Sequence, residues 1–214
     1  MLKLLKNPEQ IITVNTNGKN FKFGKLQNQI GLLSEHSIII ENNLIADIIP
    51  NASIKNESTF QIIDLTKKII LPGLVESHTH TVFAGSRSIE FMKKLKGVTY
   101  DEIAKSGGGI NTTVTAVREK SFEELVNLTI PKIKNFISQG VTTLEIKSGY
   151  GLNFENEIKM LNVINHLNKI FPIEIVSTFL GAHTFPNDLK NKREVYLDEI
   201  ILKMLPFISE NKLA

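Results

Sequence analysis

The sequence predicts an α/β protein in which a small β unit precedes a parallel sheet built from strand–helix units. Residues 1–66 contain short β-branched runs separated by turn residues, and no helical periodicity competes with them. From Lys67 onward, apolar strands alternate with helical patterns, which is typical of βα units around a parallel sheet. We therefore expect two domains, an N-terminal β unit over residues 1–66 and a βα domain over residues 67–214.

The N-terminal β unit is predicted from four apolar runs and two turn signals. Asn17-Gly18 is a strong hairpin signal. Asn42-Asn43 separates two apolar runs and predicts strand, tight turn and strand. The predicted strands are Ile11–Val14, Ser37–Glu41, Leu44–Ile49 and Gln61–Asp64.

The βα domain is predicted to contain three strands, each followed by a helix. The first strand begins at Ile69 and passes Pro72, which lacks an N–H and fits an irregular strand. The other strands are Val141–Lys147 and Ile173–Leu180, and the helices are Phe122–Ser138, Asn153–Ile170 and Arg193–Ser209.

Capping residues define where these helices begin. Ser121 and Glu124 form a capping box, and Asn153 can cap the second helix. The segment 84–120 is an excursion with a second capping box, Thr99 to Glu102. Its run Ser106-Gly-Gly-Gly109 favours a plain loop, although a triple glycine could also let the backbone approach a ligand.

Composition excludes several classes of function. The 214 residues carry 25 Lys and Arg against 22 Asp and Glu, without a basic stripe, so no nucleic-acid partner is implied. There is no cysteine, which leaves His, Asp and Glu as candidate metal ligands. No apolar run approaches the ~20 residues of a membrane span, and no signal-peptide pattern is present. We expect a soluble cytoplasmic protein without a membrane partner.

Two histidines close the first strand of the βα domain. His78 and His80 are separated by one residue, so in an extended strand both rings point to one side. Two imidazoles on one side can bind the same metal ion. The alternative is a pair of polar loop histidines.

Further polar residues follow the other two strands. Lys147 and Tyr150 come at the end of the second strand and His183 at the end of the third. Because the carboxyl ends of parallel strands share one edge of a sheet, these residues are expected to converge with the histidine pair. Lys147 could instead pair with Glu145, Tyr150 could be a partly buried aromatic whose hydroxyl binds a backbone group, and His183 could be a loop residue. Arg87 could be solvated, or could hold a carboxylate with its two-pronged guanidinium.

The segment Pro72–His80 resembles the opening motif of the amidohydrolase superfamily. A fuller set of motifs resembles the imidazolonepropionase family, in the same order and with similar spacing over residues 67–185. That set comprises Ala84–Arg87, Gly97–Tyr100, Ser106–Ile110, Glu145–Leu152, Glu157–Leu161 and Phe179–His183. Glu76 is a departure, since an Asp is commoner there. Members of the family are about twice as long, so the resemblance covers only their N-terminal half.

The resemblance implies a (β/α)8 TIM-barrel amidohydrolase fold, present here as about its first three βα units, beside a β-sandwich-like unit. It also implies one divalent metal, zinc or iron, with His78 and His80 as metal ligands. Arg87, Tyr150 and His183 would bind the substrate, 4-imidazolone-5-propanoate. That His183 is catalytic, by polarising or protonating the ring, is our own hypothesis. The product would be N-formimidoyl-L-glutamate, formed in histidine degradation, and the full-length protein would be a homodimer.

Three alternatives stay open. The 214-residue chain could be an inactive remnant or fragment, because the other ligands expected in the family, a His and an Asp, come from later strands. The enzyme could act on another cyclic amide. A two-metal site bridged by a carboxylated Lys147 would also keep the superfamily but change the substrate.

Overall fold

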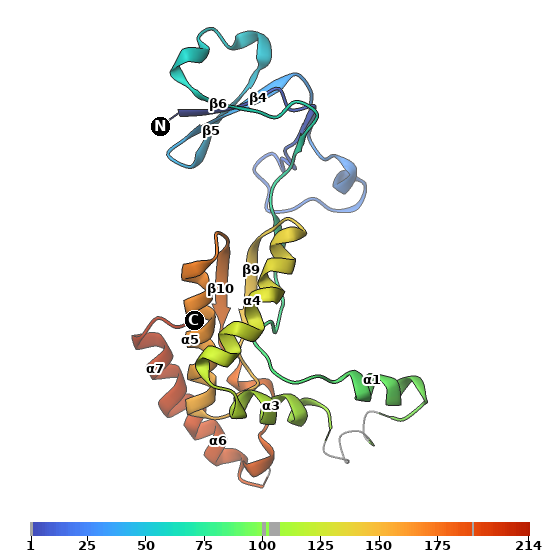
Figure 1. Ribbon diagram of the computed structural model, residues 1–214, viewed down its shortest axis with the longest axis vertical. Coiled ribbons are helices and arrows are strands. Elements are labelled where there is room, and N and C mark those ends of the chain that lie inside the picture. The colour runs from blue at the N-terminus through green and yellow to red at the C-terminus, as the bar shows by residue number, and fades with distance from the viewer. Residues whose placement is uncertain (1, 100–101, 103–107, 190) are drawn as a thin grey trace. The chain divides into compact units, whose positions relative to one another are not determined.

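The computed structural model describes residues 2–99, 102, 108–189 and 191–214 (Figure 1). The chain forms two compact units, Met1–Pro72 and Gly73–Ala214. The boundary between the units falls later than the change of sequence pattern at Lys67. The reason is that β7 (Ile69–Ile70) still pairs with β2 (Gln10–Ile12) of the first unit.

The first unit contains two small sheets. One has four strands in the order β5-β4-β1-β6, and the other has three in the order β3-β2-β7. Its buried apolar side chains include Leu4, Ile11 and Ile38. The remaining strands are β1 (Leu2–Lys6), β3 (Leu32–Leu33), β4 (His36–Glu41), β5 (Leu44–Pro50) and β6 (Gln61–Asp64). Short 3-10 turns cover Gly24–Asn28, Asn51–Ser53 and Glu57–Thr59.

The two turn signals of this unit have different outcomes. Asn42 and Asn43 both have positive φ and join β4 to β5 in a tight antiparallel hairpin, as predicted. Asn17 and Gly18 also have positive φ, but they lie inside the long connection between β2 and β3. The strands on either side, β2 and β3, do pair antiparallel, but a long connection joins them, so the tight hairpin predicted at Asn17-Gly18 is not formed.

The second unit is built on a parallel three-stranded sheet in the order β10-β9-β8. β8 is Leu74–Glu76, β9 is Val141–Lys147 and β10 is Glu174–Thr178. Helix α4 (Phe122–Ser138) packs on β9 and α5 (Phe154–Ile170) on β10, and the two helices contact each other (Figure 1). The other helices are α1 (Ser88–Leu95), α3 (Ile110–Glu119), α6 (Arg193–Glu199), a π segment (Ile200–Met204) and α7 (Leu205–Glu210). Two 3-10 turns cover Gly181–His183 and Asn187–Leu189.

Local capping explains why the two long helices begin where they do. Ser121 and Glu124 form the complete capping box of α4, and the Asn153 side chain accepts the N–H of Asn156 to cap α5. The apolar faces of these helices supply fully buried residues of one core, among them Leu125, Ile133, Leu161, Ile164 and Leu167. The predicted α/β class and parallel sheet are confirmed for this unit.

Two predictions for the second unit need correction. The first predicted strand is two short strands, because Pro72 and Gly73 separate β7, which pairs with β2, from β8, which pairs with β9. The excursion 84–120 holds helices α1 and α3, which the turn-like composition concealed. The capping-box contacts of Thr99 with Glu102 are present. Ser106 and Gly107 of the triple-glycine run lie outside the described residues.

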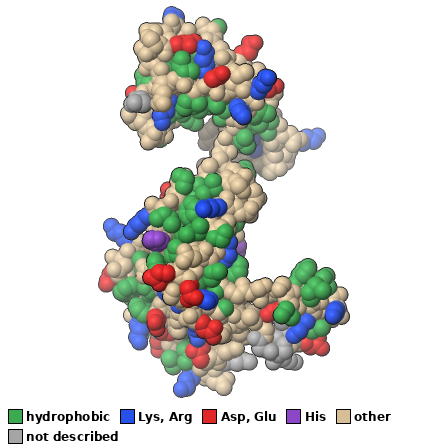
Figure 2. Space-filling view, viewed as in Figure 1, with side chains coloured by type: hydrophobic (Ala, Val, Ile, Leu, Met, Phe, Trp, Pro, Cys, Tyr) green, Lys and Arg blue, Asp and Glu red, His purple; other side chains and the backbone are tan. Residues whose placement is uncertain are grey.

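The parallel order brings the carboxyl ends of β8, β9 and β10 to one edge of the sheet, where residues 77–83, 148–152 and 179–183 follow. Hydrophobic side chains are also exposed on both units (Figure 2). Within the described part of the chain, no helix has the length and apolarity that crossing a bilayer requires.

Candidate functional site

The histidine pair is held against β9 by the residue between its members. The Thr79 carbonyl accepts the N–H of Lys147 at 2.9 Å, and the Thr79 hydroxyl donates to the Glu145 carbonyl at 2.7 Å. Backbone pairing therefore continues beyond the last residue of β8. The ring centroids of His78 and His80 lie 6.1 Å apart with an interplanar angle of 73°.

The Glu145 side chain also fastens this segment. It accepts the Thr79 N–H at 3.1 Å and forms an ion pair with Lys147. Burial alone would raise the pKa of Glu145, but hydrogen bonds from Lys147, Thr178 and Thr79 outweigh burial and lower that pKa. The pairing proposed as an alternative role for Lys147 is thus observed. A two-metal site would instead need this same Lys147 nitrogen, in carboxylated form, as its bridging group.

Tyr150 and His183 join the histidine pair from the ends of β9 and β10. The His80 ring centroid is 4.9 Å from that of Tyr150 and 4.9 Å from that of His183, and it stacks on His183 at 15°. Tyr150 and His183 are 5.5 Å apart. Side chains separated by about a hundred residues in sequence therefore meet at one edge of the sheet, as their positions after parallel strands predict.

Burial governs the electrostatics of this cluster. It lowers the pKa of His80, and the charges of His183 and His78 lower it further. It also raises the pKa of Tyr150. A neutral imidazole is the form that binds a metal, and a neutral phenol is the form that donates a hydrogen bond.

Arg87 lies just before α1 rather than in the ring cluster. Its Nε donates to Glu90 at 2.7 Å, and Glu90 also accepts the Gly109 N–H at 2.8 Å and the Thr112 hydroxyl at 3.2 Å. The Arg87 charge nevertheless reaches the cluster, since it acts to lower the pKa of Tyr150 against the effect of burial. The structure brings together four of the five predicted site residues, whereas the Arg87 side chain contacts Glu90.

Comparison with known proteins relates this chain to a group of enzymes. A scan against protein-family profiles finds no match. The chain is 41% identical over 214 residues to the imidazolonepropionase of Clostridium tetani, covering 99% of this chain and 51% of that protein. It is 44% identical over 176 residues to the imidazolonepropionase of Photorhabdus laumondii, covering 82% of this chain and 42% of that protein.

The chain is homologous to imidazolonepropionases. It spans about half the length of the curated relatives it matches. Among solved structures, it resembles a triazine hydrolase from Arthrobacter with a TM-score of 0.48 and 15% identity, over 88% of this chain and 39% of that one. A structural similarity of this strength adds nothing to the assignment made from the imidazolonepropionase sequences.

The described residues fit part of a metal site. His80 Nδ1 is buried and has no hydrogen-bond partner among the described residues, so its lone pair is available to a metal ion. Among the described residues, no three His, Asp or Glu side chains converge as ligands. A catalytic zinc site usually has three protein ligands, so the histidine pair can supply only part of one.

Lys132 of α4 is a residue that the sequence did not single out. Its Nζ donates to the Thr81 carbonyl at 3.2 Å and the Phe83 carbonyl at 3.0 Å, and lies 3.3 Å from the centroid of the Phe83 ring. Burial lowers the pKa of Lys132 to about 8. Lys132 thereby fastens the segment that follows His80 to the helix. The sequence offers no signal that distinguishes Lys132 from Lys134 on the same helix.

Proposed function

We propose that this chain supplies one side of an imidazolonepropionase active site. The enzyme would hydrolyse 4-imidazolone-5-propanoate to N-formimidoyl-L-glutamate. The observation that carries the proposal is the cluster of His80, Tyr150 and His183, with ring centroids 4.9–5.5 Å apart at the ends of three parallel strands. The homology to imidazolonepropionases supports this substrate over another cyclic amide.

The proposal includes a fold. The strand order β8-β9-β10, with α4 and α5 packed on the sheet, is what the first βα units of a (β/α)8 barrel require. In such a barrel, active-site residues sit at the carboxyl ends of the strands. The described cluster occupies those ends.

His78 and His80 would hold the divalent ion, zinc or iron. The chemistry that such an ion supplies is Lewis-acid activation of water and of a carbonyl group. The unpartnered His80 Nδ1, together with the pKa lowered by burial, supports neutral imidazole ligands here. A third ligand would come from outside the described residues.

The chain's own polar groups would bind and orient the substrate. Arg87 suits the propanoate carboxylate because a guanidinium can donate two parallel hydrogen bonds to it. Tyr150 can donate its phenolic O–H to the imidazolone ring. In the reaction, water adds to the ring carbonyl carbon, the C–N bond breaks, and the departing ring nitrogen takes up a proton. We assign that proton transfer to His183, which stacks on His80.

The test is an activity and metal assay on the full-length gene product that contains this sequence. We expect about one divalent ion per chain and release of N-formimidoyl-L-glutamate from 4-imidazolone-5-propanoate. Two ions per chain would favour the arrangement bridged by Lys147. A metal-loaded protein that leaves this substrate unchanged would refute the proposed function.

A further inference from the structure

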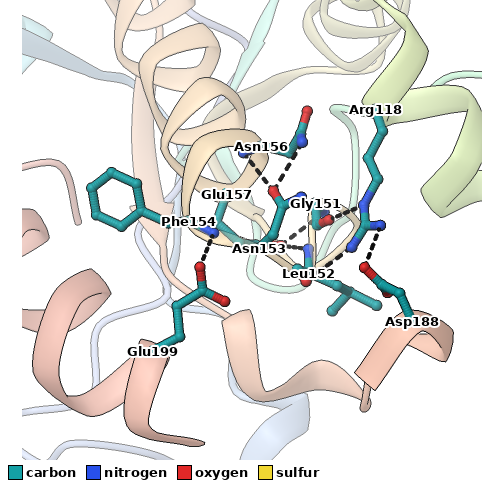
Figure 3. A network of polar contacts seen from close by, with 9 residues as sticks. All are labelled: Arg118, Gly151, Leu152, Asn153, Phe154, Asn156, Glu157, Asp188 and Glu199. Carbon is teal, nitrogen blue, oxygen red and sulfur yellow. Dashed lines mark hydrogen bonds and ion pairs between the residues drawn. The ribbon is translucent and has the colours of Figure 1, made fainter. Parts of the chain in front are cut away.

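The loop between β9 and α5, residues 148–152, carries Tyr150 and is held from two directions (Figure 3). Its N–H groups point to the Glu157 carboxylate in the first turn of α5. Its carbonyl groups accept hydrogen bonds from the Arg118 guanidinium of α3. Neither Glu157 nor Arg118 makes a ring contact with the cluster, so their effect on it passes through the loop backbone.

Glu157 binds three backbone N–H groups and is fully buried. One carboxylate oxygen accepts the Gly149 N–H at 2.9 Å, and the other accepts the Gly151 and Leu152 N–H groups at 2.8 Å each. Hydrogen bonds to a charged group are shorter and stronger than those between neutral groups. Three of them on one buried carboxylate leave the loop little freedom.

Arg118 fixes the other side of the loop. Its Nε donates to the Gly151 carbonyl at 2.7 Å, and its Nη2 donates to the Leu152 carbonyl at 3.0 Å (Figure 3). Its Nη1 pairs with Asp188 at 3.3 Å. The rigid fork of the guanidinium therefore sets the direction of two successive carbonyl groups.

Two glycines allow the loop to pack between Glu157 and Arg118. A Cβ at Gly149, where φ is +105°, would lie 2.8 Å from the Leu180 carbonyl oxygen and 3.1 Å from His183 Nδ1. A Cβ at Gly151 would lie 2.4 Å from the Glu157 backbone nitrogen. The loop thus packs directly against both α5 and the His183 ring.

His183 connects the loop of residues 148–152 to the ring cluster. Its Nδ1 lies 3.1 Å from the Gly149 carbonyl oxygen. A carbonyl oxygen only accepts hydrogen bonds, so Nδ1 must carry the proton in this contact. Nε2 is then the nitrogen that remains to exchange a proton or a hydrogen bond with a substrate.

We propose that Glu157 is a positioning residue that, with Arg118, fixes the Gly149 carbonyl and thereby selects the Nδ1–H tautomer of His183. This inference rests on the proposed function for its catalytic consequence, though not for its structural one. By holding residues 148–152, the same contacts would also orient Tyr150. The loss of either residue would let the carbonyl turn and would leave His183 in a mixture of tautomers.

The experiment uses the zinc-loaded full-length gene product with ¹⁵N-labelled histidine. Long-range ¹H–¹⁵N spectra report which ring nitrogen of His183 is protonated, and the signal is assigned by its loss in His183→Ala. We expect the Nδ1–H form in the wild type and mixed tautomers in Glu157→Gln. That variant keeps the side-chain volume but replaces one carboxylate oxygen with an NH2 group, which cannot accept a hydrogen bond. At least one of the three loop N–H groups would then lose its acceptor. We also expect kcat to fall about ten- to hundredfold, as for other orienting partners, with a smaller change in KM and no change in zinc content.

Glu155→Gln is the matched control, since Glu155 lies exposed in the same turn of α5 and carries the same charge. It should leave tautomer and kcat unchanged. Arg118→Gln tests the same loop from the other side and decides the matter if Glu157→Gln does not fold. A folded Glu157→Gln, or in its place Arg118→Gln, with the wild-type tautomer and the kcat of Glu155→Gln would overturn the inference. If the wild type does not hydrolyse the substrate, the proposed function fails, while the tautomer spectra still test the positioning role.

Discussion

Two segments that follow strands of the same sheet are held in very different ways. Residues 148–152, after β9, are clamped by Glu157 and Arg118 through five hydrogen bonds to their backbone. Helix α1, which follows β8 in the chain, has one buried residue, Glu90. Its apolar side chains are exposed, with Ile89 at 73% and Leu95 at 67%. The ring cluster is thus fixed by the first segment, whereas Arg87 depends on its contact with Glu90.

This difference separates the chemistry of the site from the recognition of the substrate. His80, Tyr150 and His183 are half-buried and contact one another, and Tyr150 packs against the hydrophobic core. Arg87, with 38% of its side chain exposed, can turn more freely toward a carboxylate. Changes in the clamped loop or at His183 should therefore affect kcat, changes at the proposed metal ligands should also affect metal binding, and changes around Arg87 should affect KM.

The largest effect is expected from removing a proposed metal ligand. His80→Ala should abolish metal binding and reduce hydrolysis to background, because His80 also stacks on His183 and contacts Tyr150. Metal content and turnover are measured on the full-length product. His166→Ala is the control, since His166 is exposed on α5. Retention of metal and activity by His80→Ala would exclude the ligand role.

Removing the residue proposed to transfer the proton should spare the metal. His183→Ala is expected to lower kcat by about 10²–10⁴-fold, the range for general acid–base groups, with metal content unchanged. Steady-state kinetics combined with metal analysis checks this. Equal turnover in the variant would remove His183 from the mechanism.

A change at Arg87 should appear mainly in KM. Arg87→Lys keeps the charge but loses the fork, which for a hydrogen bond to a carboxylate corresponds to a rise in KM of about 10- to 100-fold. Glu90→Gln is the companion variant, because Glu90 accepts from Arg87 Nε. A fall in kcat without a change in KM for Arg87→Lys would contradict the division between the two segments.

Two glycines give the smallest and most closely matched comparison. Gly149 and Gly97 both have positive φ, but a Cβ at Gly97 would meet nothing within 4 Å. Gly97→Ala should cost about 1 kcal/mol for the left-handed backbone alone, whereas Gly149→Ala adds the clash with Leu180 and His183. Hydrogen exchange of the loop amides and thermal melting measure the difference. Equal destabilisation at the two positions would show that the loop is not tightly packed.

The sequence predicted those features that depend on local pattern or on parallel topology. The helix caps at Ser121 and Asn153 can be predicted from the sequence because each side chain accepts a hydrogen bond from an N–H only three residues away. The proximity of His80, Tyr150 and His183 can be predicted because the carboxyl ends of parallel strands lie at one edge of the sheet.

Other features depend on partners that no pattern reveals. The break at Pro72 requires knowing that β7 pairs with β2 instead of continuing into β8. The same sequence is compatible with a solvated Arg87 side chain and with the observed Arg87–Glu90 ion pair, so the pair could not be predicted. The role of Glu157 is concealed because its partners are backbone N–H groups, whose identity leaves no mark on side-chain composition.

The central claim is that His78 and His80 share one divalent ion beside His183. X-ray absorption at the zinc edge of the full-length, zinc-loaded protein tests it most directly, since it counts the imidazole ligands. We predict that the wild type and His166→Ala have the same number of coordinated imidazoles, and that His78→Ala and His80→Ala each have one fewer or lose the metal. A zinc environment that is the same in all four proteins would contradict the account.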